Sequence, residues 1–354
     1  MTSRDTRDLL EKIRANFALV SELGLPRIES EYWRELLSRG RQDHGGKEGF
    51  LDREDLWANF RNNVITKGLD NANVPEEAFA RVDAKCREMY DRLVDGIPER
   101  FRPFLEESPI GNPRTIEVNG VRLTQSSIEY TYMLSHLDPY LGSVRVVVDI
   151  GGGYGGLARL IKLRHPDMRL VLLDLPEVNA IQTYFLASAF PRAKVLGLSD
   201  IVALNRIEPR ALDFDFLVLP GQLFDRLGPA SFAAVINTRS MMEMDLGTVG
   251  FYLRHIQEKL VEGGVFYCLN RYEKKTRLKD YPFDEKWRVA YSEPWPRFID
   301  ENPHHEIVAV REAHPVKGGL KELLAGFPPY EGVVERLLRM VKRKAGSSRP
   351  KRHE

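Results

Sequence analysis

Apolar and polar positions divide the chain into a helical first part and a longer remainder of alternating short runs. Apolar residues recur at helical spacing near the start, at Leu9, Leu10, Ile13, Phe17 and Val20. Ser30 precedes EYWRELLSRG as a candidate N-cap, and Pro75 begins a second helical pattern whose acidic residues come first, which suits the helix dipole. We therefore predict a mostly helical region over residues 1–105. It would serve as a cap or dimerisation element, or close over a substrate.

Short β-branched runs alternate with helical stretches from about residue 144 onward. Strands are predicted at 144–150, 168–175, 214–220, 232–238, 263–270 and, at the sheet edge, 304–314. Helices are predicted between them, at 156–165, 177–190 and 246–260. This order is typical of an α/β protein whose parallel sheet is buried on both faces. We predict a Rossmann-like sheet of seven strands, mostly parallel, in a domain over residues 106–335.

Composition narrows the class of protein only a little. The 52 Lys and Arg residues balance 51 Asp and Glu, a net charge of +1, so nucleic-acid binding is not expected. Residues 341–354, VKRKAGSSRPKRHE, are predicted to be a disordered basic tail. The first residues lack the apolar core of a signal peptide, and no apolar run approaches the ~18 residues of a membrane span, so we expect a cytoplasmic protein without membrane contact. Cys86 and Cys268 are expected to be separate core thiols.

A glycine-rich loop follows the first predicted strand of the sheet. Strand 144–150 continues into GGGYGG at 151–156, and a helix follows directly. Such a loop lets a ligand approach the backbone and the free N–H groups of the helix. Gly151, Gly153 and Gly156 satisfy the G-x-G-x-x-G pattern of dinucleotide-binding proteins, which keeps an NAD(P)-dependent oxidoreductase as an alternative.

Three neighbouring features favour S-adenosylmethionine (SAM) over NAD as the ligand of this loop. Asp149, just before the loop, would repel a pyrophosphate but attract the cationic sulfonium and amine of SAM. Asp174 ends the second strand, where an acid can accept hydrogen bonds from ribose hydroxyls of either cofactor. The sequence LVEGGVF at 260–266 is similar to the turn before the fifth strand of class I methyltransferases, with Glu262 in place of the usual proline.

Four segments together resemble the sugar O-methyltransferase family of bacteria. They are DIGGGYGGLA at 149–158, LLDLPEV at 172–178, INTRSMMEM at 236–244 and CLNR at 268–271. The resemblance covers roughly residues 105–300, and NFRNN at 59–63 extends it less specifically. It implies a class I methyltransferase fold, SAM as methyl donor, S-adenosylhomocysteine as product, and a hydroxyl acceptor on a sugar or a glycosylated metabolite.

The resemblance also implies positions for the parts of the cofactor. Residues bordering the methionine part would be Asp149, Gly151, Gly152, Gly153 and Gly155. Asp174 would bind the ribose, and Leu175, Gln222 and Leu223 would lie near the adenine. Asn237, at the end of the fourth strand, would lie near the transferred methyl group or the methionine part.

The loop after the fourth strand is where a catalytic base is expected, since a hydroxyl is a poor nucleophile. This loop holds no histidine, unlike that of the phenol-methylating relatives. Glu243 is the candidate base or hydroxyl-orienting group, or else the ion-pair partner of an arginine such as Arg239. Ser240 is a second candidate for orienting the substrate, and Asp245 is expected to cap helix 246–260.

Candidate substrate-binding residues are Arg239 in this loop and the pair Asn270 and Arg271 after the fifth strand. The adjacent His304 and His305 would face opposite sides of a strand, and no other clean set of metal ligands occurs, so the need for a metal stays open. Partners are expected to be a small hydroxyl acceptor and a second copy of the chain. A SAM-binding protein without catalytic activity remains the other alternative.

Overall fold

The computed structural model describes residues 3–25, 28, 33–35, 51–52, 54–62, 76–142, 144–229, 232–296 and 303–327. The predicted cap Ser30, most of the helix after it, and the basic tail at 341–354 lie outside these residues. No helix in the described part of the chain combines the length and the apolar character needed to cross a membrane.

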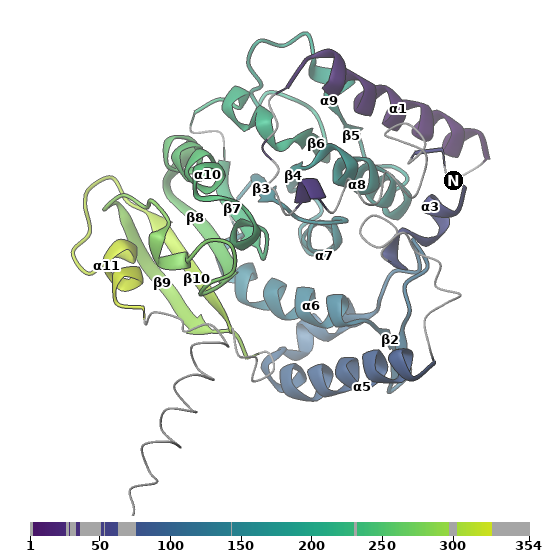
Figure 1. The fold of residues 1–354 in the computed structure, drawn as a ribbon, viewed down its shortest axis with the longest axis horizontal. Helices are drawn as coiled ribbons and strands as arrows, with labels where there is room; N and C mark the ends of the chain where they lie inside the picture. The colour runs from purple at the N-terminus through teal and green to yellow at the C-terminus, as the bar shows by residue number, and fades with distance from the viewer. Residues whose placement is uncertain are drawn as a thin grey trace, which may run out of the picture.

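One eight-stranded sheet forms the centre of the molecule (Figure 1). Its strands are β3 (Val146–Ile150), β4 (Arg169–Asp174), β5 (Val195–Leu196), β6 (Phe216–Pro220), β7 (Phe232–Thr238), β8 (Leu260–Arg271), β9 (Trp287–Pro294) and β10 (His304–Arg311). They lie in the order β5-β6-β4-β3-β7-β8-β10-β9. Pairs from β5 to β8 are parallel, and β10 is antiparallel to both its neighbours. This is the α/β fold of class I methyltransferases, with the two-residue β5 added at one edge.

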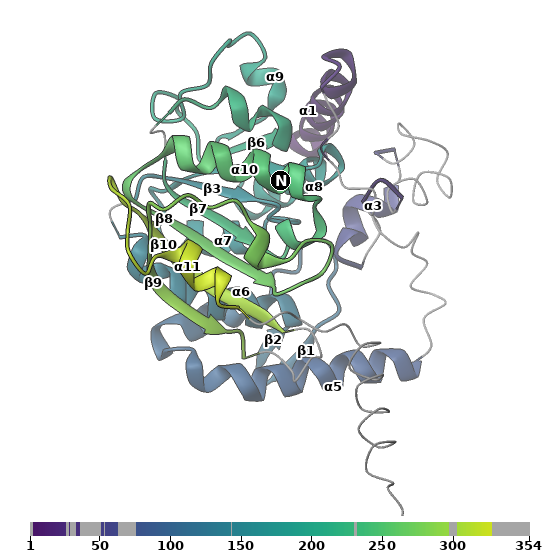
Figure 2. The same ribbon diagram turned by 60° about the vertical axis from the view of Figure 1, so that its left-hand side comes forward.

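Helices cover both faces of the sheet, which explains why its strands are continuous apolar runs. Helices α6 (Gln125–Leu137), α7 (Gly156–Arg164) and α8 (Pro176–Ala189) pack on one face with Val147, Leu172 and Ile236. Helices α9 (Leu198–Ile201), α10 (Leu246–Lys259) and α11 (Leu320–Ala325) pack on the other face. Figure 2 shows α10 and α6 on opposite sides of the sheet. Short 3₁₀ helices η5 (Asp138–Tyr140), η6 (Gly221–Arg226), η7 (Met241–Glu243) and η8 (Leu278–Asp280) lie between these elements.

The N-terminal part is helical, as predicted, and packs directly on the sheet's helices. It consists of α1 (Ser3–Glu22), α3 (Glu54–Asn59), η1 (Phe60–Asn62), α5 (Glu76–Leu93), η3 (Val94–Gly96) and η4 (Glu99–Leu105). A hairpin of β1 (Ile116–Val118) and β2 (Val121–Leu123) leads from it into α6. Ile13 of α1 belongs to the same apolar cluster as the α8 face of the sheet, and Lys12 binds Asp200 of α9 at 2.8 Å.

Several local predictions are confirmed. The Asp245 carboxylate accepts the Thr248 N–H at 2.8 Å and so caps α10. Cys86 and Cys268 are both buried and unbridged. The fifth predicted strand begins earlier than expected, at Leu260, because the residues before the two glycines already pair with β7.

Candidate active site

A pocket of about 560 Å³ opens at the carboxyl ends of β3, β4 and β7. Its walls come from the glycine loop, the end of β4, the loop after β7, helix α10 and two N-terminal positions. The lining residues are Ile28, Trp33, Gly151, Gly153, Leu173, Asp174, Leu175, Val178, Ser240, Met244, Thr248 and Tyr252. Five of the predicted site residues therefore meet at one pocket: Gly151, Gly153, Asp174, Leu175 and Ser240.

The glycines of the loop are required by close contacts with two polar side chains. Gly151 has a φ of +68°, and a Cβ atom there would lie 2.1 Å from the Oγ atom of Ser240. A Cβ atom at Gly152 would lie 2.3 Å from a carboxyl oxygen of Asp149. Both distances are far below van der Waals contact, so the loop backbone lies directly against these side chains.

Asp149 is completely buried beneath this loop. Neither of its carboxyl oxygens has a hydrogen-bond partner among the described residues. Burial raises the pKa of this carboxyl to about 7, because the charged form loses its hydration. A buried acid without donors is costly unless a ligand supplies them. The charge and the orphaned oxygens both fit a cationic ligand such as the methionine part of SAM.

Asp174 forms the wall of the pocket at the end of β4. One carboxyl oxygen accepts the Leu175 N–H at 2.8 Å, and the other accepts the Gly153 N–H at 3.1 Å. Gln182 of α8 donates to the second oxygen at 3.3 Å. Burial raises the pKa of this carboxyl to about 7 although its hydrogen bonds oppose the shift. Its position on the pocket wall suits an acceptor for ribose hydroxyls.

Two buried asparagines hold the loop after β7 instead of lining the pocket. Asn237 donates to the Ile150 carbonyl at 2.9 Å and to Ser240 Oγ at 2.5 Å. Its side-chain oxygen accepts from Asn270 at 2.8 Å, and Asn270 in turn accepts the Met242 N–H at 3.0 Å. Because these bonds use the amide groups inside the protein, both residues are placed to position the loop. Ser240 does line the pocket, but its hydroxyl donates to the Ile150 carbonyl at 3.1 Å.

Glu243 does not itself line the pocket but lies beside it, between two donors from distant parts of the chain. Its carboxylate accepts the indole N–H of Trp33 at 2.9 Å and is 2.6 Å from the Lys274 ammonium group. Trp33 itself lines the pocket, so Glu243 stands behind the indole at the pocket rim. In Figure 1, residues 33–35 are the short purple turn near β3 and β4.

Arg239 is not the partner of Glu243, contrary to the alternative raised from the sequence. Its guanidinium binds Glu129 of α6 at 2.6 Å, and its backbone adopts a left-handed φ of +60°. Its N–H donates to the Leu269 carbonyl at 2.7 Å. The residue therefore anchors the loop to α6, away from the carboxylate of Glu243.

The remaining predicted residues lie outside the lining of the pocket. Leu223 is a core residue with 1% exposure, and Gln222 beside it is 8% exposed. Their turn nevertheless adjoins the pocket, since a Cβ atom at Gly221 would lie 2.1 Å from the Tyr252 hydroxyl. Arg271 is partly buried at the end of β8.

Six pocket residues were missed by sequence reasoning: Ile28, Trp33, Leu173, Val178, Thr248 and Tyr252. Most of them are apolar, and in a sequence such side chains look like ordinary core positions. Among the described residues, no group of three or more His, Cys, Asp or Glu side chains could hold a metal ion.

Comparison with known proteins gives one family match. The family model of an O-methyltransferase domain matches residues 112–200, which include β3, the glycine loop, β4 and α8. No curated protein matches the sequence. Since the matched segment holds the cofactor loop, it connects the geometry of the pocket with methyl transfer.

Three solved structures illustrate the structural similarity. Mitomycin 7-O-methyltransferase MmcR is 15% identical, covers 86% of this chain and 96% of its own, and has a TM-score of 0.34. The SAM-dependent methyltransferase SibL is 16% identical over 64% of this chain and 69% of its own, with a TM-score of 0.32. An O-methyltransferase family 2 protein from Planctomyces limnophilus, in complex with apigenin, is 16% identical over 47% and 51%, also at 0.32.

At these TM-scores the fold assignment rests on the sheet order and the strand directions of this chain itself. The family match adds the chemistry. Residues 112–200 match an O-methyltransferase domain, which supports a SAM-dependent O-methyltransferase activity for this chain.

Proposed function

We propose that the enzyme transfers the methyl group of SAM to a hydroxyl of a sugar or of a glycosylated small metabolite. The observation that carries the proposal is the distribution of acids around one pocket. Asp149 and Asp174 flank the glycine loop, and Glu243, in the loop after β7, stands behind Trp33 at the rim. Acids on the cofactor side suit a cation and a ribose, while an acid at the rim suits an acceptor hydroxyl.

The methionine part of SAM would lie along Gly151–Gly155, with its positive charge near Asp149. The ribose would donate to Asp174. The adenine would lie between Leu175 and Tyr252, backed by the turn that carries Gln222 and Leu223. SAM supplies the activated methyl group. The protein residues bind and align it, since an in-line displacement depends on orientation.

Glu243 is proposed to receive the proton of the acceptor hydroxyl. SAM would supply the methyl group to the acceptor oxygen and leave as S-adenosylhomocysteine, and the hydroxyl proton would pass to the carboxylate. Lys274 and Trp33 both donate to this carboxylate and so fix its direction. Ser240, Asn237 and Asn270 hold the loop that carries it.

A sugar fits the rim because flat apolar and polar groups are combined there. The indole of Trp33 offers a flat apolar surface for the C–H face of a sugar ring. Arg271 and Lys274, at and after the end of β8, are proposed as donors to its hydroxyls, with Arg239 placed behind them in the loop.

The helical region over residues 1–105 is proposed to form the contact of a homodimer, which light scattering of the purified protein tests.

A panel of sugar, glycoside and phenol acceptors with radiolabelled SAM tests the proposed activity. We expect labelled product with a sugar or glycoside. Titration with SAM, S-adenosylhomocysteine and NADH separates the alternatives. Binding of NADH alone would replace the proposal by an oxidoreductase, and SAM binding without transfer to any acceptor would leave a non-catalytic SAM-binding protein.

Glu243→Gln tests the proposed base. We expect kcat to fall by at least about 10²-fold, the usual contribution of a positioned base, with SAM affinity unchanged. Asp245→Asn is the matched control, because asparagine also caps a helix and residue 245 lies in the same loop. Full activity of the Glu243→Gln enzyme would remove this residue from the mechanism.

A further inference from the structure

Two buried side chains of α8, Gln182 and Asn179, form a short chain of hydrogen bonds behind Asp174. The proposed function does not use this chain, which we call the relay. Gln182 is completely buried on α8 and donates through its Nε2 atom to Asp174 at 3.3 Å. Its Oε1 atom accepts from the Nδ2 atom of Asn179, one helical turn earlier, at 3.0 Å. Asn179 is 7% exposed.

The direction of these hydrogen bonds follows when Asp174 is ionised, the form that accepts from ribose hydroxyls. An ionised carboxylate only accepts, so Gln182 must then present its NH₂ group to Asp174. The amide oxygen of Gln182 faces Asn179 and requires a donor, which among the described residues is the NH₂ group of Asn179. The oxygen of Asn179 is left pointing away from the relay, and no described residue donates to it.

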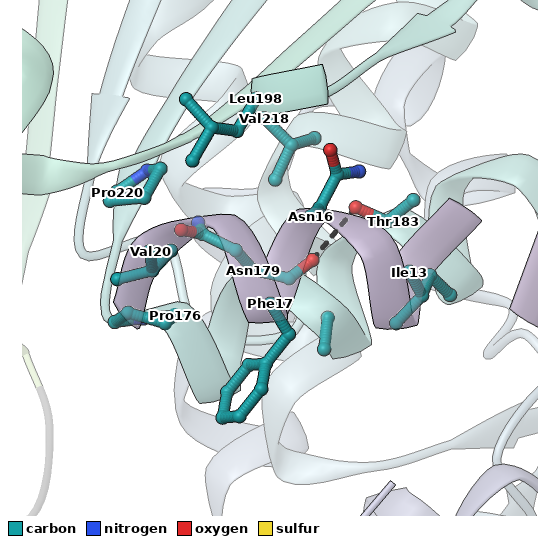
Figure 3. A pocket seen from close by; sticks show the side chains of 11 residues that line it. Ile13, Asn16, Phe17, Val20, Pro176, Asn179, Thr183, Leu198, Val218 and Pro220 are labelled. Carbon is teal, nitrogen blue, oxygen red and sulfur yellow. Dashed lines mark hydrogen bonds between the residues drawn. The ribbon is translucent and has the colours of Figure 1, made fainter. Parts of the chain in front are cut away.

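The far end of the relay lies at a second cavity, between α1 and α8 (Figure 3). Its empty space, which is partly open to solvent, is about 310 Å³. Figure 3 shows Asn179 among Phe17 and Val20 of α1 and Pro220 at the end of β6. The apolar cover from α1 limits the access of water to the relay, and hydrogen bonds are stronger in such surroundings.

We propose that Gln182, oriented by Asn179, is a positioning residue that holds the Asp174 carboxylate in the direction of the ribose hydroxyls. This inference rests on the proposed binding of SAM with its ribose at Asp174. Two backbone N–H groups, of Gly153 in the glycine loop and of Leu175 at the start of α8, already bond to Asp174. Among the described residues, Gln182 of α8 is the only side chain that donates to Asp174.

The test compares adenosine with 2′,3′-dideoxyadenosine as competitors for bound S-adenosylhomocysteine. In the parent protein, adenosine should bind more tightly because its hydroxyls reach Asp174. Gln182→Met keeps the length of the side chain but removes the donor. The affinity of this variant for adenosine should fall about tenfold. The affinity for the dideoxy compound should change little, so the ratio of the adenosine affinity to the dideoxyadenosine affinity should collapse. A merely structural role of Gln182 would weaken both competitors equally and preserve the ratio.

Asn179→Asp provides a second variant in which Gln182 stays in place. An aspartate cannot donate, so Gln182 is expected to turn its NH₂ group toward residue 179 and its oxygen toward Asp174. The affinity ratio should then collapse as in Gln182→Met. Thr183→Val is the control, because its hydroxyl donates to the backbone carbonyl of Asn179 and not to the relay. Its ratio should equal that of the parent.

The possible results distinguish a failure of the relay from a failure of the proposed function. If both Gln182→Met and Asn179→Asp keep the parent ratio, the relay is overturned while the SAM site stands. If Gln182→Met does not fold, the ratio measured for Asn179→Asp decides alone. A parent protein that binds neither SAM nor adenosine overturns the proposed function and the relay with it.

Discussion

The completely buried carboxyl group of Asp149 and the partly buried one of Asp174, beside one glycine loop, make this site sensitive to pH. Burial raises the pKa of both Asp149 and Asp174 to about 7, compared with about 3.9 for a free aspartate. Between these values each carboxyl keeps its proton in the folded chain and would release it on unfolding. The stability that they contribute to the ligand-free protein is therefore complete below about pH 4 and is lost as the pH rises through about 7.

SAM should offset the free-energy cost of ionising these two carboxyl groups, because its positive charge and its ribose hydroxyls favour the ionised carboxylates. We predict that SAM affinity increases about tenfold between pH 5.5 and 7.5, a range in which the pKa values place most of the ionisation. Calorimetric titration at both pH values measures the change. Asp149→Asn should bind SAM weakly and show a smaller dependence on pH. An affinity of the parent protein that does not vary with pH would contradict this assignment of the two acids.

The loop after β7 is held at both ends by buried interactions. Asn237 and Asn270 connect its first residues to β3 and β8. The ion pair of Arg239 with Glu129 connects it to α6, where the Glu129 side chain is only 4% exposed. The left-handed backbone of Arg239 costs energy of its own, so this ion pair stabilises a conformation that the loop would otherwise leave.

Glu129→Gln should therefore destabilise the protein strongly. Removing one partner of a buried pair leaves the other charge uncompensated, which costs about 3 kcal/mol or more of the free energy of unfolding. Chemical denaturation measures the loss. Glu88→Gln is the control, since its pair with Arg92 lies on the exposed side of α5 and should contribute below about 1 kcal/mol. Equal effects of the two substitutions would show that the Arg239 pair does not fix the loop.

At the scale of the whole molecule, the sheet and the glycine loop could be predicted because their signals are local. Buried parallel strands are continuous apolar runs, and Asp149 and Asp174 stand at fixed places relative to the glycines. The partners of Glu243 could not be predicted, because Trp33 lies 210 residues away in the sequence. Asn237 and Asn270 have residue types that suit ligand contacts, yet their amides bond to each other, and only the three-dimensional register of β7 and β8 shows this.

The N-terminal helices form part of the same core as the sheet, although the sequence places a domain boundary near residue 105. Trp57 contacts Tyr184 of α8 with ring centroids 4.9 Å apart. The guanidinium of Arg61 lies 3.9 Å above the ring of Tyr154 in the glycine loop. Arg61 also forms a two-point pair with the buried carboxylate of Glu107, at 3.1 and 2.8 Å. The first 105 residues thus support the cofactor loop from behind.

A chain that begins at residue 106 should consequently fail to form a stable cofactor site. It would expose the apolar face of α8 and leave the Glu107 carboxylate without its arginine, and each of these losses opposes folding. We predict the loss of a cooperative thermal transition and of SAM binding, measured by circular dichroism and calorimetry. Removal of residues 341–354, for which the sequence predicts a disordered tail, should leave both properties unchanged. A truncated chain that kept the parent melting temperature and SAM affinity would show instead that the helices are a separable cap. The contacts of Arg61 with the glycine loop would then contribute nothing to the free energy of unfolding.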